Sequence, residues 1–65
     1  MQITVNGENI EVEAPTLAIY LDTCGMSNQR IAVELNGEIV VKSKFNTTLL
    51  SSGDVIEIVH AIGGG

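Results

Sequence analysis

Two segments near the start of the chain alternate between apolar and polar residues. Ile3 and Val5 fall on one face of an extended segment, and residues 8–14 resume the same alternation. Between them stands Asn6-Gly7, a pair of residue types that tolerates positive φ and favours a two-residue hairpin turn. The pattern therefore predicts a β-hairpin over residues 1–14.

A change of period after this hairpin predicts a short helix. Pro15 ends the second strand, and Thr16 is a candidate N-cap. The apolar residues that follow have the spacing of one helical stripe, and they are Leu17, Tyr20, Leu21 and Cys24. Gly25 stands where a left-handed C-terminal cap is expected. We expect about two turns of helix that pack on a sheet, with Cys24 as a small buried apolar residue.

The second half of the chain predicts another hairpin and a final strand. Residues 31–35 alternate, Asn36-Gly37 supplies a turn, and residues 38–41 return. Residues 42–52 show no regular period, so we expect an irregular crossover with a short helical turn. Its apolar residues are expected to enter the core, and they are Phe45, Leu49 and Leu50. Residues 55–59 are rich in β-branched residues and predict the last strand.

These elements predict an α+β domain. Five strands and one main helix in 65 residues form one sheet with the helix across one face. No turn joins the first strand to the last. We expect these two strands to pair at the centre of the sheet, because that pairing satisfies their backbone groups.

Composition and charge restrict the class of protein further. The chain has 65 residues, which suits one small domain. Its 3 basic and 8 acidic side chains give a net charge of −5, which favours a basic protein partner over nucleic acid. One Cys and one His can form neither an internal disulfide nor a structural zinc site, so no metal is expected. The N-terminal residues do not resemble a signal peptide, and no apolar run is long enough to span a membrane. We expect a cytoplasmic protein without a membrane partner.

Enzymatic chemistry is not expected from these residues. Cys24 lies on the predicted apolar stripe, and His60 is expected on the surface at the end of the last strand. Glu11 and Glu13 share an exposed strand face, where they serve solubility. No glycine-rich loop connects a strand to a helix in the manner of a nucleotide-binding site. The chain is predicted to be a protein on which other enzymes act.

Three consecutive glycines at the end of the sequence are the strongest candidate for chemistry. We expect residues 1–62 to form the domain and residues 63–65 to form a flexible tail. Such a tail extends roughly 10 Å and can enter a channel that any Cβ would block. Its terminal carboxylate can be converted by ATP to an acyl-adenylate, from which a sulfur or nitrogen nucleophile displaces AMP. A flexible end without a function is the alternative interpretation.

The element order and the terminal glycines resemble the ubiquitin-like β-grasp fold, and in particular the ThiS family of sulfur carriers. The resemblance covers nearly the whole chain and rests on residues 1–7, Pro15-Thr16-Leu17, Leu21, residues 31–40 and residues 53–65. The family commonly has a Pro and then a Trp or Tyr after the second hairpin, where this chain has Val-Lys-Ser-Lys-Phe at 41–45. Phe45 is expected to fill the aromatic position, while Lys42 and Lys44 leave partner specificity open.

The resemblance implies a function for the tail. Gly65 would be adenylated by an ATP-dependent activating enzyme similar to ThiF and then converted to a thiocarboxylate with sulfur from a donor system. Thiazole synthase, ThiG, would take this sulfur for the thiazole of thiamin. Gly63 and Gly64 would form the threaded tail, and Ala61 and Ile62 would contact partners. No cofactor is bound permanently, since the adenylate and the thiocarboxylate are transient.

Three other functions stay open at this point. One is sulfur carriage in another pathway, as in the small subunit of molybdopterin synthase, which usually has a longer chain and an additional helical segment. Another is ubiquitin-like conjugation of the tail to lysines, which would give isopeptide products. The last is a binding module whose tail is idle. Val59, just before the tail, is expected either to contact a partner or to pack in the core.

Overall fold

The computed structural model describes residues 1–60 and confirms the predicted order of elements. The elements are β1 (Gln2–Val5), β2 (Glu8–Glu11), α1 (Leu17–Thr23), β3 (Ile31–Leu35), β4 (Glu38–Val40), the 3-10 helix η1 (Lys42–Thr47) and β5 (Val55–His60). The second strand is shorter than predicted and ends at Glu11 instead of Ala14. Its partner β1 begins at Gln2, so residues 13 and 14 have no strand beside them to extend the ladder.

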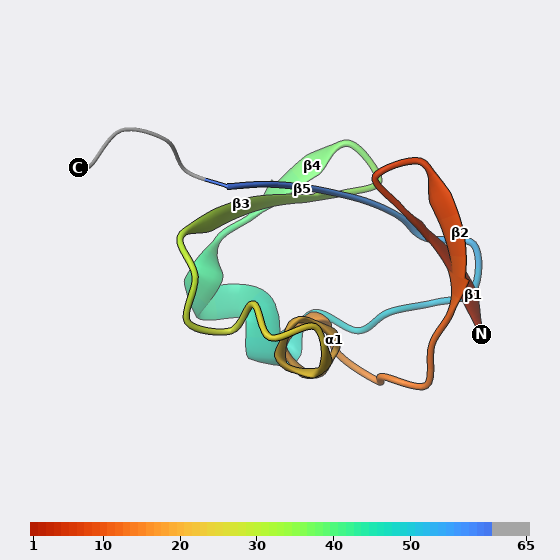
Figure 1. The fold of residues 1–65 in the computed structure, drawn as a ribbon, viewed down its shortest axis with the longest axis horizontal. Helices are drawn as coiled ribbons and strands as arrows, with labels where there is room; N and C mark the ends of the chain where they lie inside the picture. The colour runs from red at the N-terminus through yellow and green to blue at the C-terminus, as the bar shows by residue number, and fades with distance from the viewer. Residues whose placement is uncertain (61–65) are drawn as a thin grey trace.

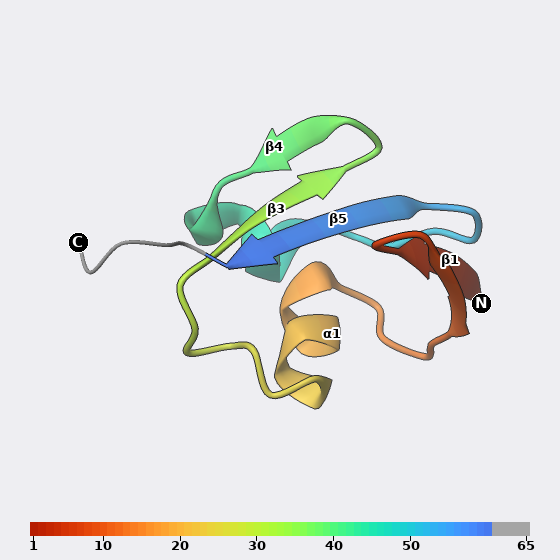
Figure 2. The ribbon, with the colours of Figure 1, turned by 45° about the horizontal axis from the view of Figure 1, so that its top comes forward.

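The five strands form one mixed sheet in the order β2-β1-β5-β3-β4. The central strand β5 runs parallel to β1 and antiparallel to β3, which confirms the predicted pairing of the first and last strands. α1 and η1 lie on the same side of the sheet, and the sheet bends around the helix (Figure 1). The view in Figure 2 shows β4, β3 and β5 side by side above α1. One face of the sheet is therefore covered and the other is open.

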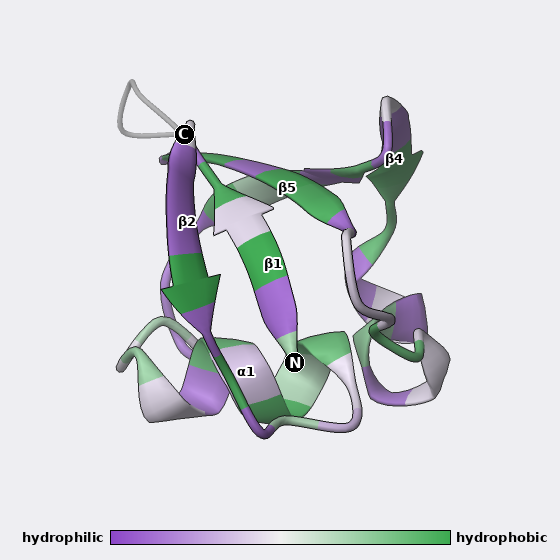
Figure 3. Cartoon of the chain, turned by 90° about the vertical axis from the view of Figure 1, so that its right-hand side faces the viewer, coloured by the Kyte–Doolittle hydropathy of each residue, from purple (hydrophilic) through white to green (hydrophobic). Residues whose placement is uncertain are grey.

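The nine buried apolar side chains lie between the sheet and α1. They are Ile3, Ala14, Leu17, Tyr20, Leu21, Val33, Leu50, Ile56 and Ile58. Buried and exposed residues alternate along β3 and β5, and Figure 3 shows bands of hydrophilic and hydrophobic residues along β1, which buries Ile3. Thr16 caps α1 as predicted, since its Oγ1 accepts a hydrogen bond from the backbone N of Ile19 at 3.2 Å.

The C-terminal end of α1 corrects the prediction for Cys24, which is exposed. The helix ends at Thr23, so Cys24 is the C-cap, and the chain turns at Gly25, which has a φ of +74°. The N–H of Met26 then donates to the carbonyl of Leu21 at 2.9 Å, and that of Gly25 donates to Asp22 at 3.0 Å. This is a Schellman motif, and it packs Met26 against the core in place of Cys24.

The crossover between β4 and β5 corrects the prediction for one of two adjacent leucines. Leu50 is buried and Phe45 packs partly buried against the core, but the side chain of Leu49 is 71% exposed. Leu49 forms an isolated antiparallel bridge with Thr16, so the chain is extended there. Successive side chains of an extended chain point to opposite sides, and only one of the two leucines can face the core.

Both hairpin turns also hold the central strand. Asn6 and Asn36 have φ values of 49° and 53°, and the glycine after each has a positive φ, as the predicted turns require. Asn6 Oδ1 accepts from the backbone N of Ile58 at 2.7 Å, and its Nδ2 donates to the carbonyl of Ile58 at 3.2 Å. Asn36 Oδ1 accepts from the backbone N of Val55 at 2.9 Å. Each turn therefore attaches its hairpin to β5 through an asparagine side chain.

Replacing Asn6 by Gly is expected to lower the free energy of unfolding by about 1–3 kcal/mol. The variant keeps a residue that tolerates positive φ but removes both hydrogen bonds to Ile58, whose backbone groups lie in the partly buried central strand. Urea denaturation would measure the loss. Asn28→Gly is the matched control, because Asn28 is exposed and makes no side-chain hydrogen bond within residues 1–60. It should change stability by about 0.5 kcal/mol or less, and equal losses in the two variants would contradict the prediction.

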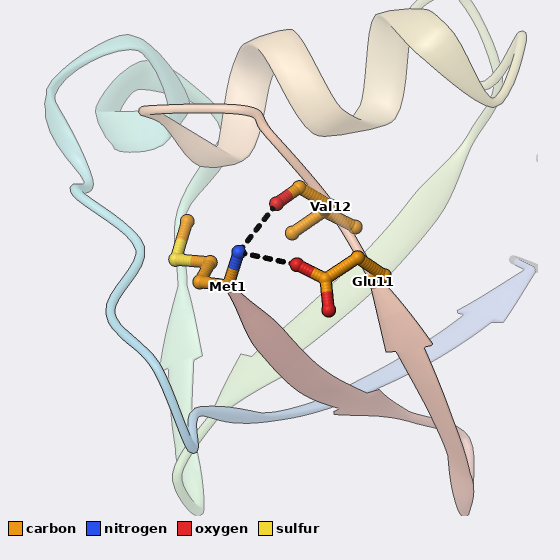
Figure 4. A network of polar contacts seen from close by, with 3 residues as sticks. All are labelled: Met1, Glu11 and Val12. Atoms are coloured by element: carbon orange, nitrogen blue, oxygen red, sulfur yellow. Dashed lines mark hydrogen bonds and ion pairs between the residues drawn. The ribbon is translucent and has the colours of Figure 1, made fainter.

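The N-terminal ammonium fixes the edge of the first hairpin. Met1 N lies 2.7 Å from Glu11 Oε2 and donates to the carbonyl oxygen of Val12 at 2.9 Å (Figure 4). This is the one ion pair within residues 1–60, and Glu11 therefore does more than add surface charge. Because the carboxylate is mostly exposed, the pair adds little to stability and chiefly positions the strand ends.

Candidate functional site

The residues predicted to carry sulfur and to enter partners lie outside the described residues. They are Ala61, Ile62, Gly63, Gly64 and Gly65. The structure describes the body up to His60, where the central strand β5 ends. The surface around the end of β5 is therefore the described part of the candidate site.

His60 is exposed at the end of β5, as predicted, and makes a specific contact there. Its Nε2 lies 2.6 Å from Gln29 Oε1, in the segment between α1 and β3. Gln29 Nε2 in turn donates to the carbonyl oxygen of Gly25 at 3.3 Å. Cys24 belongs to a different neighbourhood, since its backbone N donates to the carbonyl oxygens of Tyr20 and Leu21, each at 3.2 Å, at the end of α1. The structure therefore does not bring the Cys and the His together as a nucleophile and its base.

The open face of the sheet carries apolar side chains beside the end of β5. Val59 is 61% exposed and lies opposite Ala32 of β3, so the two point to the same side. Ile39 of β4 is 73% exposed and pairs with Glu34, which lies two residues from Ala32 on that side. Val41, also exposed, continues the alternation from Ile39. We call Ala32, Ile39, Val41 and Val59 the outer apolar patch.

The exposure of Val59 excludes one of the two expectations for this residue, packing in the core. This side chain does not pack in the core, whose β5 residues are Ile56 and Ile58. Sequence reasoning missed the rest of the patch, although a signal existed. Residues 39–41 and 55–59 carry apolar residues at consecutive positions, which indicates strands with apolar side chains on both faces. Glu34 and Glu57, paired across β3 and β5, place negative charge beside this patch.

Tyr20 is the group with a displaced pKa in the described part of the chain. Burial beneath the sheet raises the pKa of Tyr20 to about 12, and its hydrogen bond with Cys24 adds to the effect. The hydroxyl is therefore neutral at physiological pH and serves as part of the core. It offers no general base for catalysis at neutral pH.

The stability of the fold is expected to fall between about pH 10 and pH 12. In this range the unfolded state has lost the Tyr20 proton while the folded state keeps it, so the free energy of unfolding decreases with rising pH. A loss on the order of 3 kcal/mol corresponds to the rise of the pKa of Tyr20 from 10 to about 12. Urea denaturation of the wild type and of Tyr20→Phe across this range would measure the difference. A wild-type loss no larger than that of Tyr20→Phe would contradict the assignment to Tyr20.

Metal ligation and membrane crossing by a helix are two further possibilities for residues 1–60. Within this range, no group of three or more His, Cys, Asp or Glu side chains could hold a metal ion. No helix of the described part is both long and apolar enough to cross a membrane.

Comparisons with known proteins place the chain in one family. A sequence model of the ThiS family matches residues 2–65, which include the terminal glycines. The sulfur carrier protein ThiS of Bacillus subtilis is 35% identical over 65 residues, covering 97% of this chain and 98% of that protein. A thiazole synthase of Paramagnetospirillum magneticum is 39% identical over the whole chain, but the chain spans only 20% of that protein's length.

The fold agrees with the sequence match. The crystal structure of a thiamine biosynthesis protein, ThiS, from Geobacter metallireducens superposes with a TM-score of 0.85 at 32% identity, with both chains covered completely. The mixed five-stranded sheet with one helix is thus the ubiquitin-like β-grasp fold. Sequence and structure together show that this chain belongs to the ThiS family.

Proposed function

We propose that the protein is a sulfur carrier for thiamin biosynthesis and that its C-terminal Gly65 holds the sulfur as a thiocarboxylate. The observation that carries this proposal is the family match, which extends to residue 65 and so includes the terminal glycines. The relative from Bacillus subtilis, which aligns over nearly its full length, is a sulfur carrier protein by name.

The proposed chemistry takes place at the terminal carboxylate. A carboxylate oxygen of Gly65 attacks the α-phosphorus of ATP, and pyrophosphate leaves. A hydrosulfide equivalent from a sulfur donor system then attacks the acyl carbon, a C–S bond forms, and AMP leaves with the carboxylate oxygen. Adenylation is needed because a free carboxylate is a poor acyl donor, whereas AMP is a good leaving group. Gly63 and Gly64 lack side chains, so they can enter a narrow channel in a partner.

Two partners follow from this chemistry. An activating enzyme similar to ThiF would supply adenylation, and a thiazole synthase, ThiG, would accept the sulfur. The second partner is supported by two thiazole synthases, from Paramagnetospirillum magneticum and Magnetococcus marinus, that each align with the whole of this chain at 39% identity. Ala61 and Ile62 connect the body to the glycines and are proposed to contact the partner at the channel entrance.

The outer apolar patch is proposed to dock the activating enzyme. It lies beside the end of β5, so an enzyme that holds the tail would also face this patch. Burial of its apolar side chains would offset the entropy cost of ordering the tail. Glu34 and Glu57 favour a partner surface with an apolar centre and basic residues around it.

Replacing Val59 by Asp is expected to weaken binding of the activating enzyme by about tenfold or more. The substitution places a charge where the partner surface would be apolar, and Val59 is exposed, so the fold should tolerate it. Isothermal titration calorimetry would measure the affinity, with thermal unfolding as a check on the fold. Leu49→Asp is the matched control, since Leu49 is also exposed but lies outside the outer apolar patch. Equal affinities of Val59→Asp and the wild type would reject docking through this patch.

The intact mass of the protein tests the proposed function directly. After incubation with ATP, a ThiF-like activating enzyme and a sulfur donor, the mass should increase by the difference between one sulfur and one oxygen atom. Isopeptide products with lysine-containing proteins would instead favour conjugation. No change of mass with an enzyme set that activates a known ThiS protein would reject the sulfur-carrier function.

A further inference from the structure

A cavity of about 500 Å³ lies between α1, the α1–β3 segment and η1. Figures 1 and 2 show these three elements gathered on the covered side of the sheet. The side chains that make its floor are apolar and belong to the core or pack on it, and they include Leu21, Met26, Ile31 and Phe45. Its volume is in the range of small-molecule sites in proteins.

The positive charge of the protein is concentrated at this cavity. The chain has only 3 basic residues against 8 acidic ones, yet Arg30 and Lys42 both line the cavity and no acidic residue does. Neither side chain forms an ion pair with another group of residues 1–60. Each side chain is exposed and so keeps its charge free for a ligand. In a protein with a net charge of −5, two unpaired cations at one cavity indicate an anionic occupant.

We propose that this cavity binds a small organic phosphate monoester, with the phosphate between Arg30 and Lys42 and a flat apolar group on the floor beside Phe45. A phosphate monoester carries close to two negative charges at neutral pH, which matches the two cations better than a carboxylate does. The guanidinium of Arg30 can also donate two parallel hydrogen bonds to phosphate oxygens. Gln29 and Asn46, which line the same cavity, provide neutral donors.

The cavity is also connected to the end of the central strand. Gln29 lines it and contacts the imidazole of His60 at 2.6 Å. A phosphate oxygen would accept from Gln29 Nε2, which here donates to the carbonyl oxygen of Gly25 at 3.3 Å, and the amide that turns toward the ligand also carries the Oε1 that contacts His60. The His60 ring signals in NMR spectra should move when the site fills, which gives a second measure of occupancy. This site is independent of sulfur carriage and does not rest on the proposed function.

Titration of the ¹⁵N-labelled protein with phenyl phosphate tests the proposal. We expect saturable shifts of backbone amides confined to residues around the cavity, with benzoate, phenol and inorganic phosphate each binding at least about tenfold more weakly. Inorganic phosphate lacks the apolar group, phenol lacks the charge, and benzoate carries one charge instead of two. Equal affinity for phenyl phosphate and for any of the other three compounds would overturn the proposed ligand class.

Charge variants then locate the site. Lys42→Gln and Arg30→Gln should each weaken phenyl phosphate binding by about tenfold. Lys44→Gln is the matched control, because Lys44 lies in the same η1 helix but does not line the cavity. All three side chains are exposed, so the fold should be kept. Equal effects of Lys42→Gln and Lys44→Gln, or no effect of Arg30→Gln, would show non-specific attraction and overturn the proposal.

Discussion

Removal of Gly65 is expected to abolish thiocarboxylate formation. The deletion leaves a carboxylate on Gly64, but it moves the reacting group back by roughly 3.3 Å along an extended chain. Misplacement of a reacting group by about 1 Å can already reduce a rate by roughly a hundredfold. The intact mass after incubation with ATP, the activating enzyme and the sulfur donor should therefore show no exchange of oxygen for sulfur within the time in which the wild type reacts completely.

The fold should survive this deletion, which makes it a clean test of the tail. The hydrophobic core consists of side chains between Ile3 and Ile58, so the thermal unfolding temperature should stay at the wild-type value. If the deletion also lowered the unfolding temperature, the loss of activity would be explained by unfolding and not by the missing tail residue. That outcome would contradict this prediction.

Cys24→Ser separates the two groups that could hold sulfur. The Cys24 thiol is exposed, so its thiolate could attack the outer sulfur of a donor persulfide and release the donor's thiol, which adds a sulfur atom to the protein without removing an oxygen. We expect Cys24→Ser to show the same exchange of oxygen for sulfur as the wild type. Retention of sulfur after Gly65 is removed, combined with its loss in Cys24→Ser, would assign the carrier role to the cysteine.

Short-range signals were sufficient to predict most of the fold. Each Asn-Gly pair specifies a turn through the positive φ of both residues, and each hairpin follows from the alternation around it. The stripe of α1 similarly identified Leu17 and Leu21 as core residues. The central pairing of β1 with β5 required a long-range argument, namely that it would satisfy the backbone groups of two strands that no turn connects, and the structure confirms the pairing.

The errors occur where the position of a side chain depends on how an element ends. Cys24 has the spacing of the helical stripe, but the Schellman motif at Gly25 turns the chain before that side chain can reach the sheet. Leu49 is as apolar as Leu50, and only the bridge to Thr16 decides which of them faces the core. The cation-lined cavity could not be predicted either, since Arg30 and Lys42 are brought together by tertiary packing alone.

Replacing Leu21 by Ala is expected to lower the free energy of unfolding by about 2–5 kcal/mol. Leu21 is 1% exposed and contributes to the core between α1 and the sheet, so truncation removes buried methyl groups and leaves a void. Alanine and leucine are both good helix formers, so the helix itself loses nothing by the change. A domain of 65 residues has a total stability on the order of 3–10 kcal/mol, and the loss therefore amounts to a large part of it.

Urea denaturation of Leu21→Ala and of the matched variant Leu49→Ala measures how much of this cost comes from burial. The two variants delete the same atoms, but Leu49 is 71% exposed, so its truncation should cost about 0.5 kcal/mol or less. A similar cost in both variants would contradict the assignment of Leu21 to the core and Leu49 to the surface. Leu21 also forms part of the floor of the cavity that Arg30 and Lys42 line. Leu21→Ala should therefore weaken phenyl phosphate binding by the folded protein. Leu49 does not line this cavity, so Leu49→Ala should leave the binding unchanged.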